Sequence, residues 1–209
     1  MALVKLNNRG VRSATTFGSI SALGEMRFIK KQTASSSATI SFVDGTSDVV
    51  LDNTYKEYLF TFNNIHPSSD NDASFEFNVS IDSGSNYNVA KTTTAFQAYH
   101  NEADNSTGVA YSTGADLAQG TGFQILGEGA NLSADNDHGL CGYLRLFNPS
   151  STTFVKHFIA QTSSTSGADY EIHRFAAGYA NTTSAVDAVQ FKMSSNNVDA
   201  GDICLYGIN

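Results

Sequence analysis

Charged residues are scarce in this chain of 209 residues, because Asp, Glu, Lys and Arg together make up only 15% of it. Typical soluble domains carry about 25%. The chain also has no Trp, two Pro and two Cys. No apolar run approaches the ~20 residues of a membrane-spanning helix, and the first ten residues lack the apolar segment of a secretory signal. We therefore expect synthesis in a cytosol and no insertion into a membrane.

The few charges that are present are mostly acidic. The formal net charge is -8 and the sequence pI is about 4.9. Nucleic-acid binding depends on Lys and Arg that meet phosphates, so this balance argues against a nucleic-acid partner. Hydrophobic residues make up 41% of the chain, which is enough to fill a core. Its length then favours one sizeable folded domain.

Positive charge is concentrated at the N-terminus. Residues 1–31 carry a net charge of +5 and the remaining residues carry -13. Apolar residues such as Leu3, Phe17 and Ile20 are spaced through the same segment, so we expect a partner surface to bury them. We predict that residues 1–36 form a basic arm that lies on an acidic surface of its own body or of a neighbouring subunit. The alternative is a loosely attached polar extension. The anchoring residues of the predicted arm are Lys5, Arg9, Arg12, Arg27, Lys30 and Lys31.

Residues 37–209 show the alternation of apolar and polar residues that is typical of β-strands. The clearest run places Phe75, Phe77 and Val79 between polar neighbours. Clusters of Asp, Asn, Ser, Gly and Pro separate the runs, as turns require. One short helix is predicted over residues 113–119. The predicted strands cover residues 38–43, 58–63, 75–81, 94–100, 123–126, 140–147, 153–161, 171–180, 186–193 and 202–208.

About ten strands at this spacing predict an all-β fold, a two-sheet antiparallel sandwich that is jelly-roll-like. Phe residues would line the space between the sheets, and Ser, Thr and Asn, which together number 62, would cover the outer faces. Edge strands that lack Lys or Glu can pair with another chain. We therefore expect the protein to cover its edges by assembling into an oligomer.

Two groups of acidic residues with a His are the candidates for a metal site. They span residues 100–104 (HNEAD) and 135–138 (DNDH). Neither has the order of a calcium-binding EF-hand, and Asp and Asn are expected in loops between strands in any case. We therefore assign no metal and no cofactor. Cys141 and Cys204 are expected to remain reduced thiols rather than to form a disulfide.

The remaining candidate functions are sugar cleavage by Glu residues and sugar binding by Tyr residues. The sequence contains no nucleophile motif and no phosphate-binding glycine loop, so we expect a non-enzymatic protein. A glycoside hydrolase would need two paired carboxylates, for which Glu76, Glu102, Glu128 and Glu171 are the candidates. Aromatic rings can stack on sugars, although packing at sheet ends is the alternative role. The candidate glycan contacts are Tyr87, Tyr99, Tyr111 and Tyr170, with Tyr179 beside them.

Several short segments, spread over nearly the whole chain, carry a resemblance to a known family. They are residues 12–15 (RSAT), 18–21 (GSIS), 55–60 (YKEYLF), 64–67 (NIHP), 146–151 (LFNPSS), 177–179 (AGY), 181–185 (NTTSA) and 199–208 (DAGDICLYGI). Together they resemble structural proteins of tailed phages, especially marine phages such as cyanophages and pelagiphages. The resemblance implies a sandwich domain of a virion and no catalytic residues.

The resemblance also implies where the protein acts. Such proteins are tail fibre or spike components, or head surface and decoration proteins, made in the host cytoplasm and exposed on the particle. By the same analogy we expect a homotrimer that contacts other virion proteins. The alternative function is that of a carbohydrate-binding adhesin that recognises glycans on the host surface.

Overall fold

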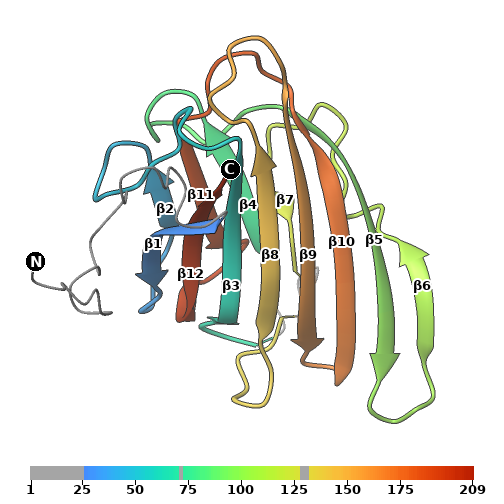
Figure 1. Cartoon of the computed structure of the whole chain (residues 1–209). Helices are drawn as coiled ribbons and strands as arrows, with labels where there is room; N and C mark the ends of the chain where they lie inside the picture. Colours follow the sequence, from blue (N-terminus) through green and yellow to red (C-terminus); the bar gives the residue numbers. More distant parts are fainter. Residues whose placement is uncertain (1–25, 71–72, 128–131) are drawn as a thin grey trace, which may run out of the picture.

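The structure, a computed structural model, describes residues 26–70, 73–127 and 132–209 (Figure 1). These residues form two antiparallel sheets of eight and four strands and no helix. The predicted all-β, two-sheet sandwich is therefore confirmed. In Figure 1 the small sheet lies behind the part of the large sheet that runs from β1 to β8, so each sheet has an inner face toward the other and an outer face away from it.

The large sheet has the strand order β1-β12-β3-β8-β9-β10-β5-β6, and the small sheet has the order β2-β11-β4-β7. The strands of the large sheet are β1 (Met26–Thr33), β12 (Val198–Ile208), β3 (Glu57–Pro67), β8 (Leu140–Phe147), β9 (Lys156–Ser166), β10 (Tyr170–Ala180), β5 (Lys91–Asn101) and β6 (Thr107–Tyr111). Those of the small sheet are β2 (Ile40–Val43), β11 (Ala188–Met193), β4 (Phe75–Ser80) and β7 (Gln124–Ile125).

Phenylalanine rings from both sheets fill the core. Phe191 of β11 lies at its centre, with its ring centroid 5.3 Å from those of both Phe60 and Phe62 on β3. Within the small sheet it stacks on Phe75 of β4 at 5.8 Å and an interplanar angle of 11°. All four rings are fully buried. The alternation read from the sequence thus places aromatic rings between the sheets, as expected.

Strand β4 is buried on both faces because loops cover its outer side. The side chain of Asn78 ties these loops down. Its amide nitrogen donates hydrogen bonds to the backbone oxygens of Tyr87 (2.7 Å) and Thr121 (3.0 Å), and its amide oxygen accepts one from Lys91 Nζ (2.5 Å). Asn78 is itself fully buried. A single polar side chain therefore organises two connections over the back of the small sheet.

Two strands and one turn region differ from the sequence prediction. Strands β1 and β6 were not predicted, and β1 lies within the range assigned to the arm. The predicted helix over residues 113–119 is wrong, because these residues form turns and bends. Their backbone groups bind the adjacent strand instead: Leu117 N donates to Thr93 Oγ1, and Leu117 O accepts from Thr93 N. Hydrogen bonds to β5 thus replace those of a helical turn.

Candidate binding surface on the outer face of the large sheet

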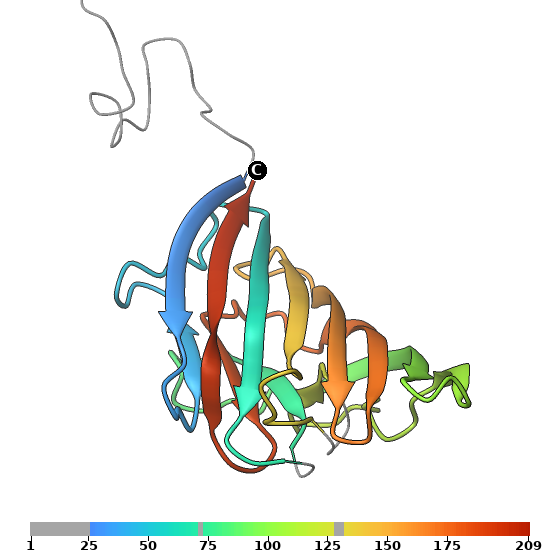
Figure 2. The same cartoon turned by 90° about the horizontal axis from the view of Figure 1, so that it is seen from below.

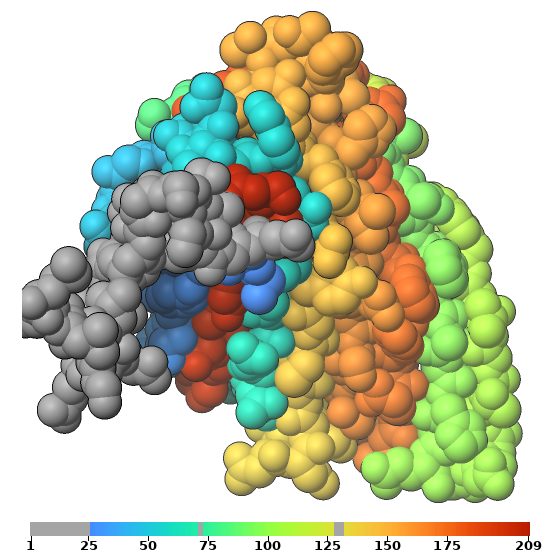
Figure 3. Space-filling view, viewed as in Figure 1, coloured from blue at the N-terminus to red at the C-terminus, as the bar shows by residue number. Residues whose placement is uncertain are grey.

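The outer face of the large sheet is rich in apolar and aromatic side chains. Alternation along each strand sends every second side chain to this face, as on β9, where Phe158 is buried and Ile159 is 47% exposed. Figure 3 shows the face from β8 to β6 open to view. Its apolar and aromatic members are Met26, Phe28, Leu59, Phe96, Val109, Tyr111, Tyr143, Phe147, Ile159, Phe175, Ala177, Tyr179 and Tyr206.

A cluster of stacked rings occupies the part of this face nearest β6. Phe96 of β5 stacks on Phe175 of β10, with centroids 4.8 Å apart and planes at 8°. The ring of His173, two residues earlier on β10, lies 4.6 Å from that of Phe175. Gln161 of β9 then bridges His173 and Tyr143 through two side-chain hydrogen bonds of 2.7 Å. Phe96 remains 45% exposed, so the cluster presents an aromatic surface to the outside.

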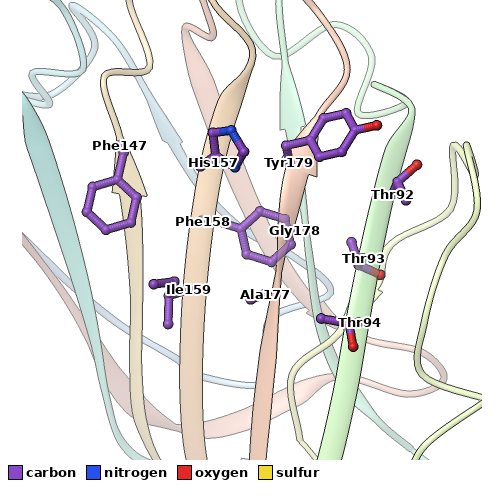
Figure 4. A pocket seen from close by; sticks show the side chains of 10 residues that line it. All are labelled: Thr92, Thr93, Thr94, Phe147, His157, Phe158, Ile159, Ala177, Gly178 and Tyr179. Carbon is purple, nitrogen blue, oxygen red and sulfur yellow. The ribbon is translucent and has the colours of Figure 1, made fainter.

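A hollow of about 470 Å³ lies on the face beside this cluster (Figure 4). Three of the ring-bearing residues that line it come from three neighbouring strands. They are Phe147 on β8, His157 on β9 and Tyr179 on β10. Gly178 forms part of the lining, and a Cβ there would come within 2.5 Å of the Thr92 backbone oxygen. The absence of a side chain at this position is what lets β5 and β10 approach. The full lining is Thr92, Thr93, Thr94, Phe147, His157, Phe158, Ile159, Ala177, Gly178 and Tyr179.

A short chain of polar side chains borders the hollow. The Gln119 side-chain amide donates hydrogen bonds to Thr92 Oγ1 (2.6 Å) and to the Tyr179 hydroxyl (3.5 Å). Its oxygen accepts a hydrogen bond from the Asn181 amide at 2.7 Å. Aromatic rings next to amide and hydroxyl groups are the chemistry by which proteins bind small polar ligands with apolar faces. Tyr179 is the one member of this group that the sequence suggested, because the other residues lie far from it along the chain.

The four tyrosines predicted to contact glycans do not converge on one site. Tyr111 lies exposed on the outer face, where its hydroxyl donates to Asp116 at 2.6 Å. Tyr99 and Tyr170 lie together on the opposite face of the same sheet, with ring centroids 6.0 Å apart. Tyr87 belongs to the loop after β4. A shared sugar site built from these four residues would have to span both faces of the molecule.

The predicted anchoring residues divide into two groups. Lys5, Arg9 and Arg12 lie outside the described residues, whereas Arg27, Lys30 and Lys31 belong to β1. Lys31 forms an ion pair with Asp202 of β12 at 3.1 Å. Arg27 shares a groove with two acidic residues, which are Asp48 and Asp52. Arg27 and Lys31 therefore lie near acidic groups of their own domain, whereas the groove that Lys30 lines contains no acidic residue.

The structure brings together the members of each predicted acid–histidine group. His100 Nε2 lies 3.1 Å from Asp104 Oδ1 in the hairpin between β5 and β6. Ligand atoms of Asp135, Asp137 and His138 lie within 4.8 Å of one another. Among the described residues these three form the group that could hold a cation, but two of them are exposed carboxylates of the kind that loops carry without one.

The candidate carboxylates and thiols are separated in the fold. Glu76 lies in the small sheet, where burial raises the pKa of its carboxyl group. Glu171 lies on the outer face of the large sheet and accepts a hydrogen bond from Ser163. Glu102 follows β5, and Glu128 lies outside the described residues. Cys141 is exposed and Cys204 is buried, and both are free thiols, as expected.

Two fully buried lysines lie beneath the hollow, in strands that flank the end of β10. Lys91 and Lys156 both pair with Ala180, one from each side. Lys156 Nζ donates to the backbone oxygens of Ser151 (2.6 Å), Phe154 (2.9 Å) and Thr182 (3.1 Å). Burial lowers the pKa of both groups, that of Lys91 to about 8. Their ammonium groups therefore hold loop carbonyls rather than carboxylates.

Comparisons with protein-family models, with curated proteins and with solved structures find no match for this chain. Within residues 26–70, 73–127 and 132–209, no helix is long and apolar enough to cross a membrane. The arrangement of the outer face is therefore the main structural guide to function.

Proposed function

We propose that this chain is a non-enzymatic structural protein of a phage virion. It would be a tail fibre or spike-associated component or a head decoration protein, exposed on the particle and anchored by its N-terminal arm. The resemblance of its sequence segments to marine phage proteins supports the virion setting and favours a homotrimer. The observation that carries an assembly role is the apolar outer face of the large sheet.

An exposed apolar face of this kind needs a partner. Monomeric proteins seldom expose continuous apolar patches larger than a few hundred Å², and larger ones mark interaction sites. Here Phe96 is 45% exposed and Tyr111 is 53% exposed at directly paired positions of this face. Neighbouring virion proteins or further copies of the chain are the partners that would cover it. Aromatic residues on the face suit this role because they contribute strongly to protein interfaces.

The test compares one truncation and one substitution variant in the phage that encodes the protein. Removing residues 1–25 leaves β1 and its ladder with β12 in place, so the protein should fold but should not join particles. A matched variant with Lys5, Arg9 and Arg12 all replaced by Ser keeps the arm's length and should show the same loss. Purified particles are measured by immunoblot and by gold-labelled antibody in electron microscopy. Truncated protein that is still incorporated at the normal level would overturn the anchoring role.

A second candidate function is glycan binding, and the hollow beside Tyr179 favours it. Rings from three strands border a chain of hydrogen-bonding groups formed by Thr92, Gln119 and Asn181. Sugars offer an apolar face to the rings and hydroxyls to the amides. On this proposal the protein is an adhesin that recognises glycans on the host surface.

The adhesin proposal predicts a specific loss of binding. Tyr179→Ala should weaken binding to host surface polysaccharide by roughly 10-fold or more, as expected when an aromatic contact is truncated. Tyr99→Ala serves as the matched control because Tyr99 lies on the opposite face of the sheet. Glycan arrays followed by titration calorimetry provide the measurement. Equal binding by both variants would contradict a site at the hollow.

A further inference from the structure

The two edges of the large sheet differ in how well they are protected against pairing with another chain. Strand β1 forms one edge and carries Arg27, Lys30 and Lys31, and its ladder is interrupted by a bulge after Phe28. Charges, especially Lys, and bulges are devices by which proteins keep edge strands unpaired. This edge is therefore blocked.

Strand β6 forms the other edge and has none of these devices. Its residues, TGVAY, include no charge and no Pro, and its ladder with β5 is regular. Among the described residues it has a partner strand on one side only. Four of its five residues are exposed, and Val109 at its centre is 76% exposed. Figure 1 shows the strand at the free side of the sheet.

The direction of its free backbone groups follows from the ladder with β5. Ser112 N donates to Ala95 O, and Asn101 N donates to Ser106 O. Because hydrogen-bonded pairs alternate along an antiparallel ladder, the even-numbered residues of β6 bond to β5. The N–H and C=O groups of Thr107, Val109 and Tyr111 therefore point away from the sheet. These odd-numbered residues also send their side chains to the outer face, in line with Phe96.

We propose that β6 is a self-complementary edge that pairs antiparallel with β6 of a second copy about a two-fold axis. Val109 lies at the centre of the strand, so it would face Val109 of the partner copy. Thr107 would face Tyr111 at either end, and every one of these pairs brings free N–H and C=O groups together. The contact would form about six backbone hydrogen bonds. It would join the two large sheets into one continuous sheet.

The side chains favour this partner over any other. Strand β6 carries no charged side chain, so it has nothing to attract an oppositely charged partner. The same strand on a second copy is equally neutral and therefore suits it. Pairing would cover Val109 and would place the Tyr111 of one copy beside the Thr107 of the other. Tyr111 is already held by its hydrogen bond to Asp116. The aromatic cluster of Phe96 and Phe175 on each copy would then continue across the junction, and a two-fold interface of this type is isologous and closes on itself.

This inference keeps the self-assembly of the proposed function but gives it a two-fold contact in place of the three-fold one, and sedimentation of the complete chain tests it separately from particle incorporation. The wild-type protein should sediment as a pair at micromolar concentration. Val109→Lys and Val109→Glu should each weaken association by roughly 10-fold or more, because each places like charges directly opposite one another. An equimolar mixture of the two variants should associate again, because unlike charges then face each other. Val109→Thr, which adds no charge and suits a strand, is the matched control and should associate like the wild type.

The outcomes are distinct. A wild-type monomer, or a trimer that Val109→Lys leaves intact, overturns the edge contact but leaves the virion role standing. Failure of the Lys and Glu variants to associate when mixed overturns the two-fold register. At a dilution where the wild type is also a monomer, the melting temperatures of all variants should equal that of the wild type, because the Val109 side chain is exposed and contributes little to the core. A large fall in melting temperature would show that the substitution acts on the fold instead.

Discussion

At the scale of single residues, Phe191 is the side chain around which most of the core rings gather. Its ring contacts Phe60, Phe62 and Phe75, and it also lies 6.3 Å from the ring of Phe42 on β2. Deleting a large buried ring removes its contacts and leaves a cavity that the neighbours fill only in part. The sequence predicted that this ring points inward, since it alternates with polar neighbours, but not that it is the centre.

We expect Phe191→Ala to lower the free energy of unfolding by about 4 kcal/mol. Phe154→Ala is the matched control, because Phe154 is 68% exposed in a loop. It should change the same free energy by less than about 0.5 kcal/mol. Denaturant titration followed by circular dichroism measures both. Equal effects of the two substitutions would contradict the central position of Phe191.

At the scale of strands, the sequence predicted the interior of each sheet better than its edges. Strand β8 was predicted with its observed bounds. It lies between β3 and β9, and its buried residues alternate with more exposed ones along the strand. Strand β6 was missed since only one side of it is paired and its residues are mostly exposed. Strand β1 was missed because the bulge after Phe28 breaks its alternation. Burial creates the period-two pattern, so strands with little burial do not show it.

The candidate site was harder to predict than the fold. Tyr179 was named from its residue type alone, whereas Phe147, His157 and Gln119 acquire their places only through strand order and register. A shift of one residue would send each of these strand residues to the core. The sequence gives the spacing along each strand but not which strands are neighbours. That order is set by packing across the whole sandwich.

At the scale of the whole molecule, ionisable groups buried in the fold make its stability depend on pH. The Lys91 ammonium is fully buried, and its pKa falls to about 8 in the folded state from 10.5. Between these values the unfolded chain binds more protons, so stability rises with pH. Lys156 contributes in the same direction. Burial raises the pKa of the Tyr58 hydroxyl above its usual 10, so stability falls again once unfolded tyrosine ionises.

The melting temperature should therefore rise from pH 8 and reach its maximum near pH 10 before it falls. Lys91→Met should flatten the rising limb, because the neutral side chain has no proton to lose. It should leave the fall above pH 10 unchanged, since Tyr58 remains. Thermal melts followed by circular dichroism across this range measure both effects. A variant that retains the full rise would show that Lys91 is not its main source.

The pairing of β1 with β12 also determines how the molecule bears mechanical load. Met26 lies directly opposite Ile208, so the first described strand begins where the last one ends. Figure 2 shows these two strand ends together at one corner of the sheet. The ladder bonds of an antiparallel pair lie perpendicular to the strands. A force that separates these two points therefore breaks the hydrogen bonds of the ladder one after another. A pull between Met26 and the far end of β12 instead shears all of the bonds together. A tether on residues 1–25 would thus hold firmly or peel away according to where on the body the drag acts.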